Sequence, residues 1–332
     1  MSFFGNSKEE NVHKTRVGVL RGGPSSEYEV SLKTGATVLE HLPRKYNPID
    51  IYIDRNGKWH LNGVVSPPEK ILKQIDIAFN AMHGEYGEDG KVQKILESFN
   101  VPYTGSASLP SALTMNKFFA REYFKKAGLK IPEGSVLKKE EKSYIKVFEI
   151  FSNFKKPLVV KPMSCGSSVG VSIVENFENF TEALEKAFKY SPAVLIEEYI
   201  KGKEATCGVM ESLNDNSYQV LPPIEIRPTK SSFFDLESKY DGSTEEICPG
   251  EFSDSITEQI QDIAAKAHDV MGLRHYSRAD MIVRDDGEIY LLETNSLPGL
   301  TPESLLPKSL KASGYSLTDF IDHVITLAIA RK

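Results

Sequence analysis

The sequence has few cysteines and lacks a long apolar run. Its three cysteines, Cys165, Cys207 and Cys248, are odd in number and form no CxxC pair among 332 residues. This usage indicates a reducing compartment and argues against a disulfide framework or a zinc site. No apolar stretch is long enough to span a bilayer, and the start MSFFGNSKEENVHKT is too polar for a secretory signal. We therefore expect a cytoplasmic protein with no membrane partner.

The sequence also lacks an excess of positive charge. It has 40 lysines and arginines against 46 aspartates and glutamates, which gives a net charge of −6. Because a nucleic-acid-binding surface needs a basic surplus, we expect no nucleic-acid partner. With 40% hydrophobic and 26% charged residues, the composition is that of a globular protein with two or three domains.

The first third of the chain alternates strand-like and helix-like segments. RVGVL is followed by a glycine turn and by a helical stretch from about Ser25, and IDIYID and IDIAFNAMHG predict two further strands. This alternation is typical of an open, mostly parallel sheet, which we place in an α/β domain over residues 15–105. We expect residues 1–14 to form a disordered tail.

The rest of the chain predicts two α+β domains. Over residues 106–200, SALTMNKFFAREYFKKAG predicts one helix closed by Gly128, and strands PLVVK and AVLIEEY flank the helical TEALEKAFKY. Over residues 201–332, TCGVM and YQVLPPIEI predict antiparallel strands. The aperiodic segment RPTKSSFFDLESKYDGSTEEICPGEF has the length of a functional lid. A helix follows in SITEQIQDIAAKAHDVMG, where Ser255 and Glu258 have the spacing of a capping box.

The segment KPMSCGSSVG, from Lys161 to Gly170, directly follows the buried-looking strand PLVV. Its glycines permit unusual backbone angles, its serines add hydroxyls without bulk, and Lys161 supplies a positive charge. Such a loop can fold over an anion and present backbone N–H groups to it. A flexible surface loop has the same composition, so both interpretations stay open at this point.

The stretch SRADMIVRDDGEIYLLETNSLPG predicts a hairpin that carries carboxylates. If Asp286 and Gly287 form a two-residue turn, Asp280 faces Glu293 and Arg278 faces Asn295. All four side chains then project from one side of the sheet. Two opposed carboxylates with an amide oxygen suit Mg²⁺. The alternatives are a solvated hairpin or a simple surface pair of Asp280 with Arg278, and a three-residue loop would shift the register.

Together these motifs resemble the D-alanine–D-alanine ligases of the ATP-grasp superfamily, from Val17 to about Leu327. The resemblance rests on VGVLRGGPSSEYEVSL, HGEYGEDG, KPMSCGSSVG, ESKY, and SRAD with LLETNSLPGLTPESL. It implies a three-domain ATP-grasp architecture of α/β and α+β class. It also implies ATP-dependent ligation of two D-alanines through an acyl phosphate for peptidoglycan precursor synthesis. ATP, two Mg²⁺ ions (or Mn²⁺ in their place) and a homodimer belong to the same expectation.

The resemblance implies roles on the substrate side. Glu27 would hold the ammonium of the first D-alanine, completed by Ser167 and Tyr240. Arg278 and the backbone N–H of Gly299 would stabilise the tetrahedral intermediate. The remaining substrate residues are Ser304 and Leu305 for the second D-alanine, with His83 and Glu88 beside the first. Judged alone, Glu27 would be a helix-start glutamate favoured by the helix dipole, and His83 a core histidine.

The resemblance also implies nucleotide and metal sites. The residues expected to bind ATP through its phosphates are Lys117, Lys161, Ser168 and Lys239. Those expected around adenosine are Glu197, Tyr199, Ile200 and Glu204. Asp280, Glu293 and Asn295 would hold the two Mg²⁺ ions.

Three other functions compete with this interpretation. A related ligase could use D-lactate, D-serine or another carboxylate and amine, although SKYDG offers no evident base for a hydroxyl acceptor. A dinucleotide-binding oxidoreductase needs GxGxxG after a strand, and RGGPSSE lacks that spacing. A non-catalytic ATP-binding regulator should have lost metal ligands, whereas Asp280, Glu293 and Asn295 are all present.

Overall fold

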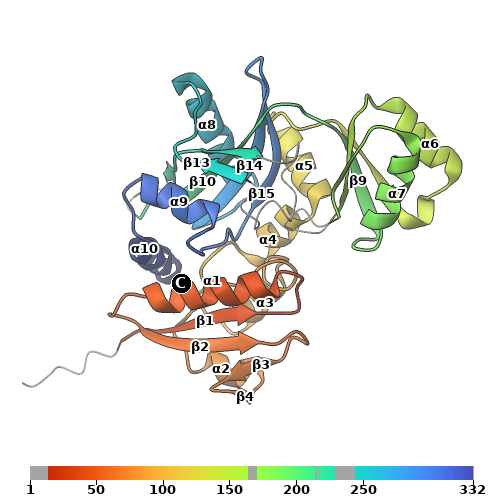
Figure 1. The fold of residues 1–332 in the computed structure, drawn as a ribbon. Helices are drawn as coiled ribbons and strands as arrows, with labels where there is room; N and C mark the ends of the chain where they lie inside the picture. The colour runs from red at the N-terminus through yellow and green to blue at the C-terminus, as the bar shows by residue number, and fades with distance from the viewer. Residues whose placement is uncertain (1–13, 164–169, 214, 216, 229–243, 332) are drawn as a thin grey trace, which may run out of the picture.

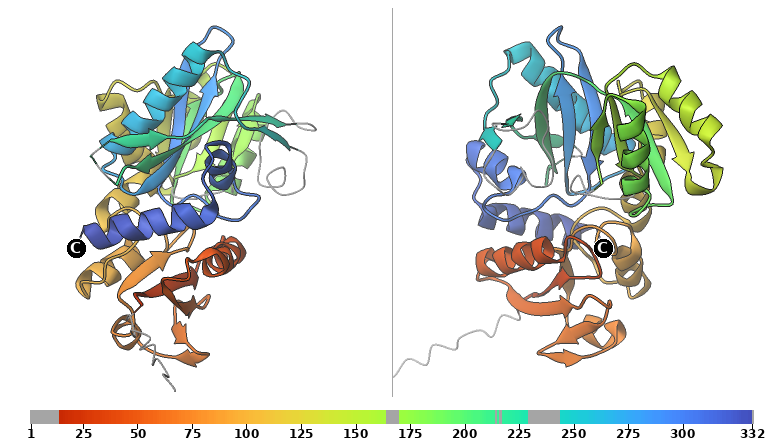
Figure 2. Two further views of the ribbon diagram at one scale, coloured as in Figure 1. Left: turned by 90° about the vertical axis from the view of Figure 1, so that its left-hand side faces the viewer. Right: turned by 45° about the vertical axis from the view of Figure 1, so that its right-hand side comes forward.

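The computed structural model describes residues 14–163, 170–213, 215, 217–228 and 244–331. Within these residues the strands form three β-sheets, each with its own helices (Figure 1). In the two further views of Figure 2, the second and third sheets stand on the same side of the first. No helix in the described residues is long and apolar enough to cross a membrane.

The first sheet has the order β4-β3-β2-β1-β5, and β1 runs parallel to both β2 and β5. Its elements are β1 Arg16–Gly22, α1 Tyr28–His41, β2 Asn47–Ile53, β3 Trp59–Leu61, β4 Val64–Val65, α2 Pro68–Leu72, β5 Ile77–Asn80 and α3 Lys91–Ser98. The predicted strands are present, and β3 and β4 add an antiparallel edge that the sequence pattern did not indicate.

A helix from the far end of the chain completes the core of the first sheet. α10, Leu317–Ala330, packs Phe320 and Val324 against Val19 and Phe79, and it lies beside α1 (Figure 1). α10 begins at a capping box made by Ser316 and Asp319. The amino-terminal sheet is therefore held by both ends of the sequence.

The second sheet is antiparallel in the order β6-β9-β7-β8. Its elements are β6 Gly134–Lys138, the short 3₁₀ helix η1 Lys139–Glu141, α6 Tyr144–Asn153, β7 Leu158–Pro162, β8 Ser172–Val174, α7 Phe177–Ala187 and β9 Ala193–Glu198. α6 and α7 pack on it through a core that includes Val147, Phe180 and Leu184.

The helix predicted before this sheet is two helices, α4 Ser108–Met115 and α5 Lys117–Lys126. Asn116 separates them because its side chain caps α5, accepting from the backbone N–H groups of Phe118 and Phe119. Ala120 and Phe124 of α5 pack in the core of the third sheet. The domain boundaries at residues 105 and 200 stay a prediction.

The third sheet has the order β13-β12-β10-β14-β15, with β11 paired to β10. Its elements are β10 Lys203–Glu211, β11 Tyr218–Val220, β12 Ile224–Pro228, β13 Thr244–Ile247, α8 Asp254–Val270, β14 Tyr276–Val283, β15 Ile289–Asn295 and α9 Leu305–Ala312. The predicted capping residue of α8 is wrong: Ser253, not Ser255, accepts from Ile256 N and starts the helix two residues earlier.

Candidate active site

The β14–β15 hairpin pairs Asp280 with Glu293 and Arg278 with Asn295, as predicted, but by another route. Arg284 N donates to Glu288 O at 2.8 Å and Gly287 N to Arg284 O at 3.0 Å, which encloses a three-residue turn with Gly287 at φ 86°. The predicted two-residue turn is therefore wrong. A register shift between Asp280 and Met281, typical of a β-bulge, restores the alignment.

The two faces of this hairpin differ in their surroundings. Ala279 and Met281 are buried against Ile260 and Ala264 of α8. The side chains at 278, 280, 293 and 295 project from the opposite, half-buried face. The hairpin is therefore not the solvated one that the sequence left as an alternative.

Arg278 and Asp280 form an ion pair on this face. The guanidinium Nε and Nη2 donate to the two Asp280 oxygens at 2.9 and 2.8 Å, and Thr206 Oγ1 donates to Oδ1 at 2.5 Å. The two side chains are only 14% and 15% exposed, so the pair is internal and not the surface pair considered above. Burial opposes the charge of Arg278, but Asp280 outweighs it and raises the arginine pKa.

Glu293 and Asn295 have partners of their own. Lys117 Nζ lies 3.1 Å from Glu293 Oε2, and Asn295 Oδ1 accepts from Leu297 N at 2.9 Å. Lys117 N also donates to Met163 O at 3.2 Å, next to the end of β7. The first residue of α5 therefore links the hairpin to the second sheet.

The donor set on this face suits a hard cation. Two carboxylates and an amide oxygen share one side of the sheet, and each already binds a cation or an N–H group. The described residues contain no group of three or more His, Cys, Asp or Glu side chains able to enclose a metal. A partial set fits Mg²⁺, which keeps water and takes further oxygens from substrate phosphates.

Lys161 and Glu197 meet where β7 and β9 lie side by side. Lys161 forms an ion pair with one oxygen of Glu197, and Arg121 of α5 forms an ion pair with the other. Arg121 Nη2 also donates to Pro132 O at 2.6 Å. Glu197 is buried at 2% exposure, and its two partners are 11% and 12% exposed. Arg121 was missed from the sequence, although it lies four residues after Lys117 and so on the same face of α5.

The other residues predicted to bind the nucleotide divide into two groups. Tyr199 and Ile200 follow β9 directly and Glu204 lies in β10; all three are half-buried. Ser167, Ser168, Lys239 and Tyr240 lie outside the described residues, as do residues 229–243 of the lid segment predicted over 227–252. The described end of that segment includes the strand β13, so it is not aperiodic throughout.

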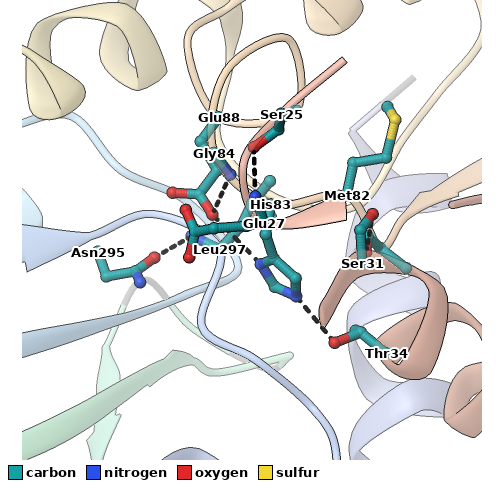
Figure 3. Close-up of polar contacts among 12 residues, drawn as sticks. Ser25, Glu27, Ser31, Thr34, Met82, His83, Gly84, Glu88, Asn295 and Leu297 are labelled. Atoms are coloured by element: carbon teal, nitrogen blue, oxygen red, sulfur yellow. Dashed lines mark hydrogen bonds and ion pairs between the residues drawn. The ribbon is translucent and has the colours of Figure 1, made fainter. Parts of the chain in front are cut away.

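His83, predicted to lie beside the first D-alanine, has Glu88 on one side of its ring and Thr34 on the other, with Glu27 nearby (Figure 3). Its Nδ1 is 3.2 Å from Glu88 Oε1, and its Nε2 is 2.8 Å from Thr34 Oγ1 on α1. Gly84 N donates to the same Glu88 oxygen at 3.1 Å. A Cβ on Gly84, which has φ 70°, would lie 2.9 Å from Glu27 Oε2, so the Glu27 carboxylate lies directly against this turn.

The neighbouring carboxylates and burial shift the pKa values of both His83 and Glu88. Burial alone would lower the pKa of His83, but the Glu88 hydrogen bond and the charges of Glu88 and Glu27 raise it. Burial raises the pKa of Glu88, as does the nearby charge of Glu27. His83 is thus a buried histidine whose ring is hydrogen-bonded at both nitrogens, and the neighbouring carboxylates favour its charged form.

The segment after β15 brings the remaining predicted residues together. A Cβ on Gly299 would lie 2.8 Å from Ser304 Oγ, and that hydroxyl is 2.8 Å from Thr301 Oγ1. Ser304 immediately precedes α9. Leu305 packs beside Ile224 and Ile226 in a small core.

Comparison with known proteins identifies the family. The chain matches the models described as D-ala D-ala ligase N-terminus, over residues 16–71 and 64–106, and D-ala D-ala ligase C-terminus, over residues 123–326. It is 40% identical over 322 residues to the D-alanine–D-alanine ligase of Geobacter sulfurreducens, covering 96% of each chain.

Two solved structures share the fold. The VanG D-Ala:D-Ser ligase from Enterococcus faecalis has a TM-score of 0.83 and 31% identity, covering 95% of this chain and 99% of that one. The D-alanine–D-alanine ligase from Bacillus anthracis complexed with ATP has a TM-score of 0.80 and 33% identity, covering 96% and 98%. The predicted family and fold class are confirmed: the chain belongs to the D-alanine–D-alanine ligase family.

Proposed function

We propose that this chain joins two D-alanines into D-alanyl-D-alanine, consuming ATP and releasing ADP and phosphate, for peptidoglycan precursor synthesis. The observation that carries the proposal is the match to D-alanine–D-alanine ligases over nearly the whole chain, with 40% identity to one of them. The ATP complex of a relative supports ATP as the phosphoryl donor.

The chemistry explains why such a site needs charged side chains around both the ATP phosphates and the first D-alanine. A carboxylate is a poor electrophile, so ATP transfers its γ-phosphoryl to a carboxylate oxygen of the first D-alanine, giving an acyl phosphate and ADP. The neutral amine of the second D-alanine attacks the acyl carbon, and phosphate leaves as the amine loses a proton. Charge must be neutralised during phosphoryl transfer, and water must be excluded because it would hydrolyse the acyl phosphate.

The substrate-side roles follow from charge and position. Glu27 binds the ammonium of the first D-alanine, and the His83–Glu88 pair supports the turn beside it. Arg278, internal and charged, stabilises negative charge on the tetrahedral intermediate together with the N–H of Gly299. The proposal also includes Ser304 and Leu305 for the second D-alanine, and Ser167 and Tyr240 beside Glu27.

The nucleotide-side roles follow in the same way. Lys161 and Lys117 bind the ATP phosphates, and Glu197 orients Lys161 while it borders the adenosine pocket. The proposal further includes Ser168 and Lys239 for the phosphates, and Tyr199, Ile200 and Glu204 for adenosine. When bound, Mg²⁺ held by Asp280, Glu293 and Asn295 would neutralise the charge of the transferring phosphoryl group. A homodimer in the cytoplasm completes the proposal.

Phosphate release tests the reaction. We expect the purified protein to release phosphate from ATP and to form the D,D-dipeptide only when Mg²⁺ and D-alanine are both present. L-alanine is the matched control because it differs only in chirality. Equal turnover with L-alanine, or none with D-alanine, would contradict the proposal.

The acceptor needs its own experiment because the VanG D-Ala:D-Ser ligase has a TM-score of 0.83 to this chain. D-alanine should be offered together with D-serine, and separately with D-lactate at pH 6. We expect D-alanyl-D-alanine to predominate in both mixtures, with its rate rising with pH as the acceptor amine loses its proton. Predominant D-alanyl-D-serine or D-alanyl-D-lactate would reassign the acceptor.

A further inference from the structure

Helix α1 buries three serine and threonine hydroxyls, those of Ser31, Thr34 and Thr37. A buried hydroxyl is costly unless it is hydrogen-bonded. Ser31 donates to Gly22 O at 2.7 Å, and Thr37 donates to Lys33 O at 3.0 Å, so both bond to the backbone. Thr34 instead reaches a side chain 49 positions away, with its Oγ1 2.8 Å from His83 Nε2 (Figure 3).

The direction of this hydrogen bond follows from the ring's surroundings. Glu88 faces Nδ1, the charge of Glu27 lies nearby, and the backbone of Leu297 also favours the charged ring. The charge of Glu88 also acts on Arg278, across the site. When both ring nitrogens carry hydrogen, Nδ1 donates to Glu88 and Nε2 donates to Thr34. Because Thr34 is 1% exposed, water is poorly placed to replace its hydroxyl.

The contacts continue from the ring to the proposed substrate site. Glu88 Oε1 accepts from both His83 Nδ1 and Gly84 N, so one carboxylate oxygen fixes the ring and the following backbone. Gly84 has no room for a Cβ, because that atom would lie 2.3 Å from Ser25 Oγ and 2.9 Å from Glu27 Oε2. A small movement of this turn therefore moves the surface that borders Glu27.

We propose that Thr34 is a positioning residue for the first substrate: its hydroxyl holds the His83 ring, which through Glu88 holds the Gly84 turn against Glu27. The inference rests on the proposed function only where it names D-alanine as that substrate. The contacts between Thr34, His83 and Glu88 belong to the protein without ligand.

The first test measures the titration of His83 in the intact protein without ligand. The ring resonances of the seven histidines are followed by NMR against pH, and His83→Gln identifies the signal of His83. Losing a hydrogen bond to a charged group should lower the His83 midpoint by about one pH unit or more in Thr34→Val. Thr34→Ser keeps the hydroxyl and should keep the midpoint.

The matched control is Thr37→Val, which removes a hydroxyl from the same helix without touching His83. It should leave the midpoint where it is in the parent protein. If Thr34→Val does not fold, Thr34→Ala compared with Thr34→Ser replaces it. An unchanged His83 midpoint after loss of the Thr34 hydroxyl overturns the inference.

The second test distinguishes a specific role at the D-alanine site from a general loss of folded structure. In Thr34→Val the KM for the first D-alanine should rise about tenfold, as expected when one hydrogen bond to a charged group is lost. The KM for ATP should stay within about twofold, and Thr37→Val should change neither value. Equal increases in both KM values would overturn the positioning role. Should the parent protein fail to ligate D-alanine, the proposed function falls, while the NMR titration still decides the role of Thr34.

Discussion

The two ends of the candidate site are built with opposite charge. At the end proposed to bind the nucleotide, Lys161 and Arg121 flank the single carboxylate of Glu197. At the end proposed to bind the first D-alanine, the carboxylates of Glu27 and Glu88 act on the single ring of His83. Two cations around one anion suit the phosphates of ATP, and two anions around one cation suit an ammonium group.

The comparison shows how each end keeps like charges together inside the protein. Two buried carboxylates repel unless a cation lies between them, and two buried cations repel unless an anion does. Glu197, at 2% exposure, contacts both of its cations, whereas His83, at 4% exposure, contacts Glu88 and is influenced by the charge of the half-buried Glu27. Between the ends, Arg278 with Asp280 and Lys117 with Glu293 give equal numbers of both signs.

The largest expected effect comes from the carboxylates of the β14–β15 hairpin, which lie between the two ends of the candidate site. Asp280→Asn and Glu293→Gln should each lower kcat about a hundredfold or more, because each removes charge where we propose that the phosphoryl group is transferred. Both side chains are outside the apolar cores, so thermal unfolding should change little. The measurement is steady-state turnover at saturating Mg²⁺, with melting followed by circular dichroism.

Asp285→Asn is the matched control for these variants. It changes an exposed aspartate at the turn of the same hairpin and should retain parent turnover. Near-normal turnover of either Asp280→Asn or Glu293→Gln at saturating Mg²⁺ would rule out a shared metal face.

A smaller, selective effect should separate the two ends. Glu27→Gln should raise the KM for D-alanine about thirtyfold or more with little change for ATP, because a charged partner of the ammonium is lost. Lys161→Met should do the reverse, since it leaves Glu197 with Arg121 and removes a cation from the phosphates. The measurement is the KM for each substrate at saturating concentration of the other.

Lys155→Met is the matched control for Lys161→Met, because it removes an exposed lysine from the segment just before β7. It should change neither KM. If either Glu27→Gln or Lys161→Met weakened both substrates equally, the two ends would not act separately.

The sequence predicted best those features that depend on neighbouring residues. The pairing of Asp280 with Glu293 joins positions close in the chain, and strand alternation with a short turn predicted it. The turn itself was wrong, and the pairing holds only because the register shift between Asp280 and Met281 offsets the extra turn residue. The split between α4 and α5 was missed because Asn116 interrupts the helix by capping, inside an otherwise continuous helical pattern.

Features that depend on distant contacts could not be predicted in this way. Arg121 meets Glu197 across 76 positions and Thr34 meets His83 across 49, so no local spacing indicates either contact. A buried hydroxyl such as Thr34 has the same local pattern as Thr37, which bonds only to its own helix. The packing of α10 against Val19 and Phe79 likewise depends on topology, because an amphipathic helix does not specify which sheet it will cover.

The smallest expected effect contrasts two buried histidines, only one of which belongs to the substrate end. For His83, burial opposes the charge, but the Glu88 hydrogen bond with the charges of Glu88 and Glu27 raises its pKa above 6.5. For His268, bonded to Ser277 at 2.7 Å, burial lowers the pKa to about 4. The Nε2 of His268 has no hydrogen-bond partner among the described residues.

The sign of each contribution to stability follows from the direction of the shift. The raised pKa of His83 gives stability that is fully present below about pH 6.5 and is lost as pH rises through the folded-state value. The lowered pKa of His268 gives stability that is fully present above about pH 6.5 and is lost as pH falls toward 4. Urea unfolding of the parent, His83→Gln and His268→Gln between about pH 5 and 8.5 measures both. The advantage of the parent over His83→Gln should shrink as pH rises. Its advantage over His268→Gln should grow, by about 1–2 kcal/mol across this range. Slopes of the same sign would mean that Glu27 and Glu88 do not keep His83 charged, and the substrate end would then lack the central cation that distinguishes it from the nucleotide end.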